Sequence, residues 1–119
     1  RNIEPEIIRE NFISSENITI VREGMRQTIE SGSARRLNSL PVKVAGKTGT
    51  AQWGVDKDNH AWFTSFAPYD NPEIVLTILV EEGIEGSGIA TSIAGEILNW
   101  YFTKDQINTS TENNNVLDN

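Results

Sequence analysis

The segment that determines the fold is Val44-Ala45-Gly46-Lys47-Thr48-Gly49-Thr50-Ala51-Gln52. Around its start Val42 and Val44 alternate with Lys43, and the run from Val42 to Gln52 is typical of a β-strand. Within that strand, Lys47, Thr48 and Gly49 would place an ammonium, a hydroxyl and a bare stretch of backbone at one point of the strand edge. This combination suits the binding of a carboxylate beside an acyl group under attack.

Two more strands are expected after this one. Residues His60–Ala67 are rich in aromatic side chains, and the turn formers Pro68–Pro72 close a hairpin behind them. Residues Ile74–Val80 are almost continuously β-branched or Leu, with Thr77 the single polar residue. That pattern predicts a strand that is covered on both faces.

Two helices flank the strands. Ser14 or Ser15 is a suitable N-cap for the first helix, which we expect to end near Ser31 with Gly32 just beyond it. Its apolar stripe consists of Ile18, Val21, Met25, Thr28 and Ile29. The second helix has its predicted buried face at Ile89, Ile93, Ile97, Trp100 and Tyr101, with Ala90 and Ala94 allowing close approach.

The expected order is therefore helix, strand, strand, strand, helix, which is an α+β fold with an antiparallel sheet. Arg1–Ile13 is expected to be an extended opening segment, and the chain begins with Arg1 instead of Met. Two helices are too few to cover both faces of the sheet, so the chain has the character of a fragment of a larger domain. We expect residues 1–102 to belong to that domain and residues 103–119 to form a disordered polar tail.

Composition excludes several classes of function. The chain has 119 residues, 37% of them hydrophobic, and a formal net charge of −7. This charge disfavours nucleic acid and anionic membranes as partners, and the apolar run Ile74–Val80 is far too short to span a bilayer. There is no cysteine. His60 is the single histidine and has no cysteine or second histidine as a partner, so we expect no metal site. We expect no cofactor either.

Several separate motifs together resemble one known family. They are Ile20-Val21-Arg22-Glu23-Gly24-Met25-Arg26, Gly46-Lys47-Thr48-Gly49-Thr50-Ala51-Gln52, His60-Ala61-Trp62-Phe63, Ala67-Pro68 and Asn71-Pro72-Glu73. In this order the chain is similar to the C-terminal part of the transpeptidase domain of class B penicillin-binding proteins, in the penicillin-binding protein 2 group. The resemblance implies the serine β-lactamase/transpeptidase-like fold, and it covers roughly residues 3 to 102. K-T-G is the third signature of these enzymes, beside S-x-x-K and S-D-N.

The implied chemistry is peptidoglycan crosslinking by acyl transfer from D-Ala-D-Ala stem peptides. By similarity, Lys47 positions substrate and takes part in the proton relay, while Thr48 bonds the substrate carboxylate. Gly49 lets substrate lie against the strand, and the backbone N–H of Thr50 is an oxyanion-hole donor. Lys47 and Thr50 are thus the implied catalytic residues, and Lys47, Thr48, Gly49 and Thr50 the implied substrate-binding residues.

One departure from the family pattern limits this interpretation. No Ser-x-x-Lys occurs in these 119 residues. Ser15-Glu16-Asn17 spells Ser-x-Asn, but we reject it as the second active-site motif because it sits where a helix cap is expected. The segment would therefore act only together with the remainder of its transpeptidase domain. The resemblance implies peptidoglycan stem peptides and β-lactams as ligands. It also implies a place on the extracytoplasmic face of the bacterial inner membrane, anchored by an upstream segment. A D,D-carboxypeptidase or β-lactamase relative, and a non-catalytic β-lactam sensor, stay open as alternatives.

Other conspicuous residues favour structural roles. His60 begins a predicted strand, and the aromatic residues Trp62, Phe63 and Phe66 of that strand are expected in the core. Trp53, just beyond the K-T-G strand, is as compatible with a place near the cleft as with a structural one. The acidic residues between Glu81 and Glu85 fit no EF-hand spacing and are expected in a solvated loop.

Overall fold

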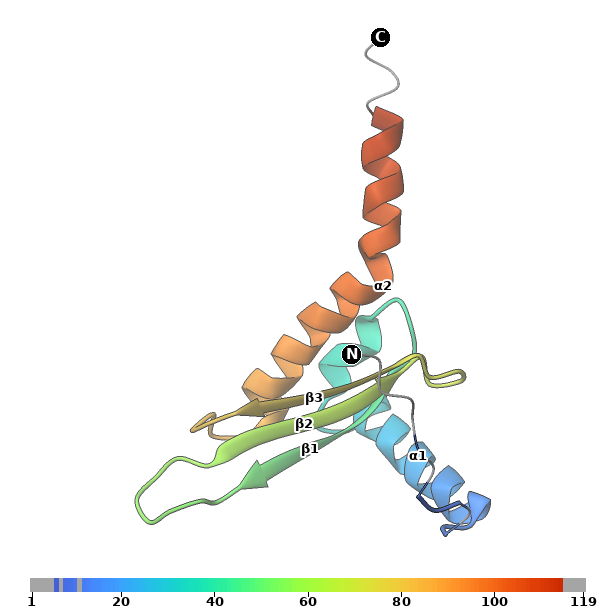
Figure 1. Ribbon diagram of the computed structural model, residues 1–119. Coiled ribbons are helices and arrows are strands. Elements are labelled where there is room, and N and C mark those ends of the chain that lie inside the picture. Colours follow the sequence, from blue (N-terminus) through green and yellow to red (C-terminus); the bar gives the residue numbers. More distant parts are fainter. Residues whose placement is uncertain (1–5, 7, 11, 115–119) are drawn as a thin grey trace.

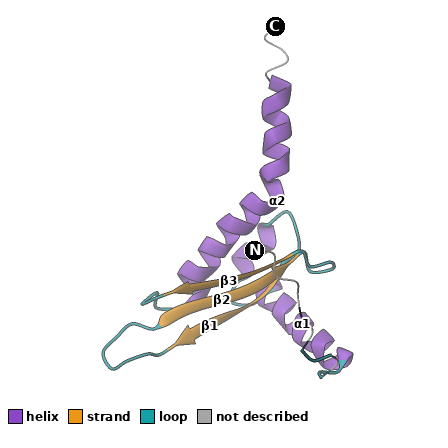
Figure 2. Cartoon of the chain, viewed as in Figure 1, coloured by secondary structure: helices purple, strands orange, loops and turns teal. Residues whose placement is uncertain are grey.

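The computed structural model describes residue 6, residues 8–10 and residues 12–114. Two long helices and a three-stranded sheet make up the fold (Figure 1), and loops join them as Figure 2 shows. In order, the elements are α1 (Ser15–Glu30), η1 (Arg35–Ser39), β1 (Ala45–Ala51), β2 (His60–Ala67), β3 (Ile74–Val80), η2 (Gly86–Ala90) and α2 (Thr91–Asn114). The predicted order of helices and strands is confirmed, and the short helices η1 and η2 are additions to it. The opening segment has no helix or strand in its described residues.

The sheet is antiparallel with the strand order β1-β2-β3. Thr48 of β1 lies opposite Phe63 of β2, which in turn lies opposite Ile78 of β3. Because side chains directly opposite each other share a face, this row belongs to one face of the sheet. The neighbouring row, Lys47, Thr64 and Thr77, belongs to the other face. The register therefore determines on which face each residue of the K-T-G motif lies.

Helix α1 begins where the capping pattern predicts. The Ser14 side chain accepts a hydrogen bond from the Asn17 N–H at 3.3 Å, and Glu16 occupies the first turn. At the other end, the N–H groups of Ser31 and Gly32 both donate to the Gln27 carbonyl at 3.1 Å. The rejection of Ser15-Glu16-Asn17 as a second active-site motif is consistent with this cap.

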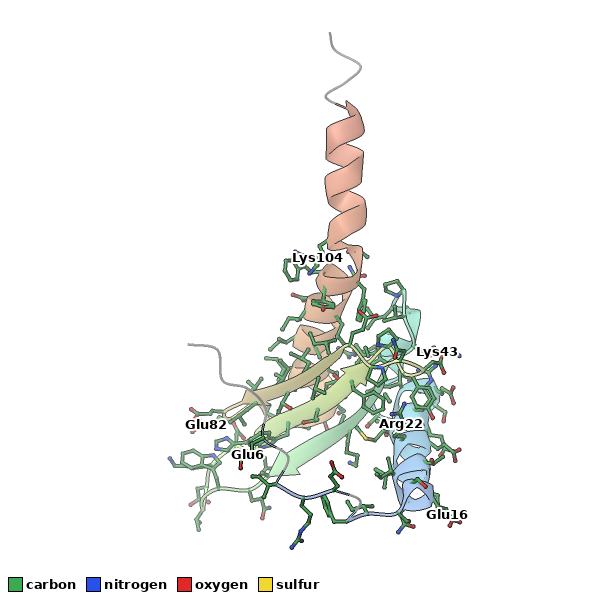
Figure 3. All side chains as sticks on the ribbon, turned by 45° about the vertical axis from the view of Figure 1, so that its right-hand side comes forward. Glu6, Glu16, Arg22, Lys43, Glu82 and Lys104 are labelled. Atoms are coloured by element: carbon green, nitrogen blue, oxygen red, sulfur yellow. The ribbon has the colours of Figure 1, made fainter. Side chains whose placement is uncertain are left out.

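Arg22 connects α1 to the end of β2. Its guanidinium donates to the Tyr69 carbonyl at 2.6 Å and lies 5.0 Å from the centre of the Phe66 ring. Figure 3 shows Arg22 and Lys43 at the same end of the sheet, opposite the end that carries Glu82. Helix α1 is thereby held alongside β1, the strand with which it makes most of its contacts.

The predicted close approach at Ala90 and Ala94 is confirmed, but the large apolar residues of the predicted buried face of α2 are not the fully buried ones. Ala90, Thr91, Ala94 and Leu98 are fully buried, whereas Trp100 is 61% exposed and Ile89 is 47% exposed. Apolar residues occupy both sides of this helix, so their spacing does not indicate which side packs. The sheet selects the side with small residues, because alanine lets the helix axis approach the strands closely. The core cluster accordingly joins Leu98 to Phe63 and to Ile29 of α1.

The prediction that β3 is covered on both faces is also wrong. Exposed and half-buried residues alternate along the strand, and Val75 and Leu79 are 71% and 44% exposed. Trp62 of β2, which we expected in the core, lies on the same face and is 38% exposed. One face of the sheet therefore carries the core and the other is open, in agreement with the expectation that two helices leave part of the sheet uncovered.

Helix α2 also extends further than we expected. It continues through residues 103–114, where the composition predicted a disordered tail, and its second half projects away from the sheet (Figure 1). No glycine or proline occurs between Thr103 and Asn114 to interrupt the backbone hydrogen bonds, and each added residue contributes one more bond. Residues 115–119 of the predicted tail lie outside the described residues. No described helix combines the length and apolar character needed to cross a membrane.

Candidate functional site

The K-T-G motif lies on β1 at the edge of the sheet. Within the described residues no strand pairs with β1 on the side away from β2. The Val44 carbonyl accepts from Arg26 at 2.8 Å, and the Thr48 carbonyl accepts from the Lys47 ammonium at 2.6 Å. Backbone groups alternate along a strand. The N–H and C=O of Thr50 therefore face this free edge as well, ready to pair with an extended ligand.

The Lys47 side chain is solvent-exposed and starts from the open face of the sheet, where its residue pairs with Thr64. Its bond to the Thr48 carbonyl turns the ammonium towards the free edge. A positive charge at this place attracts an anionic group that approaches the strand edge.

The hydroxyls of Thr48 and Thr50 belong to the opposite face, because these residues pair with Phe63 and Ala61 in the core row. The four site residues of the sequence analysis are thus brought together along one strand edge, but not on one face. Lys47 approaches the edge from the open side and the two threonine hydroxyls from the core side. Gly49 pairs with Trp62, and a Cβ on Gly49 would stand 3.2 Å from the Trp62 Cβ.

The short helix η2 supports the K-T-G strand from the core side. Gly86 packs so closely that a Cβ there would meet the Trp62 carbonyl oxygen, and would lie 2.5 Å and 3.0 Å from the Gly49 oxygen and nitrogen. These are backbone atoms of a paired row in the sheet, so they cannot rotate aside. Gly86 has no distinguishing signal in the sequence, because glycine is common in loops and the Gly86 contact is with residues distant along the chain.

We expect Gly86→Ala to destabilise the fold by about 1–3 kcal/mol, the usual cost of forcing an extra carbon into a packed site. The measurement is the urea unfolding midpoint. Gly88→Ala is the matched control in the same short helix, because a Cβ at Gly88 meets nothing within 4 Å. Equal midpoints for the two variants would contradict the close contact between Gly86 and β1.

Two further residues that the sequence analysis did not assign to the site contact the K-T-G strand. Arg26 holds the Val44 carbonyl, and the same guanidinium pairs with Glu30 at 3.1 Å. Ser33, in the turn after α1, has its hydroxyl oxygen 2.9 Å from the Thr48 hydroxyl oxygen. Neither contact has a signature in the sequence, because each joins segments that the fold brings together.

Trp53 and His60 form a structural unit at the far end of β1 and β2. Their rings stack with centroids 5.0 Å apart, and the Trp53 indole donates to the Asp58 carbonyl at 3.0 Å. His60 Nδ1 accepts from the Glu82 N–H at 3.1 Å, in agreement with its expected role at the start of a strand. The part of the chain that the structure describes contains no group of acidic or histidine side chains arranged to hold a metal ion.

Comparison with known proteins agrees with this geometry. A family model described as the penicillin binding protein transpeptidase domain matches residues 2–99. The chain belongs to the penicillin-binding protein transpeptidase family. The resemblance inferred from the sequence motifs and the predicted fold class are thereby confirmed.

Two curated members of the transpeptidase family and one solved structure illustrate the similarity. The peptidoglycan D,D-transpeptidase MrdA of Haemophilus influenzae is 38% identical over 76 residues, which are 52% of this chain and 12% of that protein. MrdA of Acinetobacter baumannii is 32% identical over 99 residues, covering 71% of this chain and 15% of its own length. The structure of Pseudomonas aeruginosa PBP2 in complex with WCK 5153 superposes with a TM-score of 0.72 at 31% identity, over 84% of this chain and 23% of that one.

The chain thus spans less than a quarter of each of these three transpeptidase-family proteins.

Proposed function

We propose that this chain forms the K-T-G wall of the active site of a penicillin-binding D,D-transpeptidase that crosslinks peptidoglycan. The observation that carries the proposal is the position of Lys47-Thr48-Gly49-Thr50 on a free strand edge, in a chain that the transpeptidase family model matches over residues 2–99.

In the proposed reaction, a serine elsewhere in the complete enzyme attacks the carbonyl carbon between the two D-Ala residues of a stem peptide. An ester forms, the C–N bond breaks, and the terminal D-Ala leaves with a proton on its amine. An amine of a neighbouring stem peptide then attacks the ester, and a new amide forms as the serine hydroxyl is regenerated. Penicillin acylates the same serine by opening its lactam ring.

The residues of this chain would bind and orient the substrate in that reaction. Lys47 supplies a positive charge for the substrate and belongs to the proton relay, and the Thr48 hydroxyl donates to the substrate carboxylate. The Thr50 N–H, which faces the free edge, stabilises the oxyanion of the tetrahedral intermediate. Gly49 has no side chain, so an extended peptide can lie directly along the strand.

The remainder of the transpeptidase domain is the partner we propose for the open face of the sheet. Trp62, Val75 and Leu79 present apolar surface on this face, and a folded domain would cover it. We further propose that the complete enzyme works at the extracytoplasmic face of the bacterial inner membrane, where its peptidoglycan substrate lies.

Labelling with penicillin tests the proposal. The complete protein should form one covalent penicilloyl adduct on a serine outside these 119 residues, as measured by intact mass and peptide mapping. The chain by itself should form none, because it contains no Ser-x-x-Lys. A complete protein without an adduct would refute the proposed function. A stoichiometric adduct on a serine of the isolated chain would refute the claim that the nucleophile lies outside these 119 residues.

Measurements of acceptor use and turnover on the complete protein separate the alternative functions. Incorporation of an added amine acceptor into the D-Ala-D-Ala donor indicates a transpeptidase, whereas water as the sole acceptor indicates a carboxypeptidase. Rapid release of hydrolysed penicillin indicates a β-lactamase, and a stable adduct without turnover of any peptide indicates a sensor.

A further inference from the structure

Ser33 occupies a well-defined position in the turn that follows α1. The residue before it, Gly32, donates to the Gln27 carbonyl at 3.1 Å, and the residue after it, Ala34, donates to the Thr28 carbonyl at 3.1 Å. Ala34 is fully buried in the core. The backbone on both sides of Ser33 is therefore held in place, and its side chain projects from a rigid support.

The Ser33 side chain reaches the K-T-G motif. Its hydroxyl oxygen lies 2.9 Å from that of Thr48, and either group has the geometry to be the donor. Ser33 itself is exposed and Thr48 is half-buried, so the pair lies at the boundary between the core side of β1 and solvent.

The chemistry of a carboxylate ligand selects one direction for this hydrogen bond. A carboxylate only accepts hydrogen bonds, and a threonine hydroxyl has a single proton to donate. When Thr48 donates to a carboxylate, its oxygen must accept from Ser33. The two hydroxyls then form a chain in which each bond strengthens the next.

The surroundings of Ser33 are open and carry more positive than negative charge. Ser33 is one of the residues that line a cavity of about 530 Å³, whose charged lining residues are Arg35, Arg36 and Glu85. With two arginines and one glutamate, the lining of this cavity has a net positive charge. An anionic part of a ligand is therefore attracted to the side of the K-T-G strand on which Ser33 lies.

We propose that Ser33 is a positioning residue for the carboxylate of the substrate: it donates to Thr48 and thereby aims the Thr48 proton at that carboxylate. The proposal rests on the proposed function, since it requires that Thr48 binds the substrate carboxylate. It adds a residue outside the K-T-G motif to the recognition of the ligand.

The test uses the complete enzyme and two probes, benzylpenicillin and its methyl ester, which lacks the free carboxylate. Ser33→Ala should lower the second-order rate of acylation by benzylpenicillin about fivefold, the loss typical of one hydrogen bond between uncharged groups. The reaction with the methyl ester should stay unchanged. Ser33→Thr, which keeps the hydroxyl, should react with benzylpenicillin within about twofold of the wild-type rate.

A double-mutant cycle with Thr48→Val makes the test independent of how fast the ester reacts. Ser33→Ala should cause no further loss in the Thr48→Val background, because its effect acts through the Thr48 hydroxyl. Ser39→Ala is the matched control, since the Ser39 hydroxyl donates only to the nearby Arg36 carbonyl. It should leave both acylation rates unchanged.

Three results would overturn the proposal: a normal rate for Ser33→Ala, equal losses for benzylpenicillin and its ester, or full additivity with Thr48→Val. A wild-type enzyme that benzylpenicillin does not acylate would instead refute the proposed function, and this inference with it.

Discussion

Replacing Lys47 by Ala in the complete enzyme should lower acylation, by penicillin and by a D-Ala-D-Ala peptide, at least tenfold. The Lys47 side chain is exposed and fills no part of the core, so the protein should stay folded. Its ammonium lies at the strand edge, where it bonds the Thr48 carbonyl. A charge in this place acts on the developing charge of the transition state and on the orientation of the substrate, so its loss reduces the rate.

Thr48→Val should impair acylation less than Lys47→Ala, since it removes one hydroxyl and keeps the shape of the side chain. Lys43→Ala is the control: Lys43 precedes β1, and its ammonium pairs with Asp70 at 3.3 Å at the end of the sheet. It should change neither rate. Stopped-flow acylation and circular dichroism provide the measurements. A normal rate for Lys47→Ala, or a larger loss for Thr48→Val, would mean that the substrate does not bind along this edge.

The largest effect on stability should come from Leu98→Ala in α2. Leu98 is fully buried and belongs to the same core cluster as Phe63 and Ile29. Leu→Ala changes at such sites cost about 3–5 kcal/mol, the sum of lost burial and the cavity left behind. Because a small domain has little more stability than this, the variant should lose most of its cooperative unfolding transition in urea.

Trp100→Ala is the informative comparison for Leu98→Ala. Both residues lie on α2, but Trp100 is 61% exposed and its ring contacts the ammonium of Lys104 at 5.6 Å. We expect a change within about 0.5 kcal/mol, as is usual for surface substitutions. A larger loss for Trp100→Ala than for Leu98→Ala would show that the opposite face of α2 packs on the sheet.

The packing of α2 depends on more than the hydrophobic pattern of its sequence. The spacing correctly indicated that Ala90 and Ala94 approach the sheet, but it grouped them with the large residues Ile89 and Trp100 instead of with Leu98. Hydrophobicity alone favours burial of the side of the helix that carries the large apolar residues. The side that packs is decided by the distance at which the helix can approach the strands, which is a property of the assembled layers.

The candidate site also contains residues that a local sequence pattern predicts and residues that only the folded structure brings to it. The K-T-G strand was predicted because its chemistry lies within four consecutive residues, Lys47 to Thr50. Ser33 and Gly86 were missed because their contacts with Thr48 and Gly49 cross 15 and 37 residues of chain. Such contacts leave no local pattern, since serine and glycine are ordinary in turns and loops.

The sequence by itself determined the order of the elements, an N-cap for α1 at Ser14 or Ser15, and the strand that carries Lys47. These features depend on interactions between residues a few positions apart, and propensity and spacing record such interactions. Only the tertiary structure decided which face of β3 is open, which side of α2 is buried, and that β1 has a free edge in the described sheet. Those outcomes depend on strand register and on how closely the layers approach, and both are set by packing between distant segments.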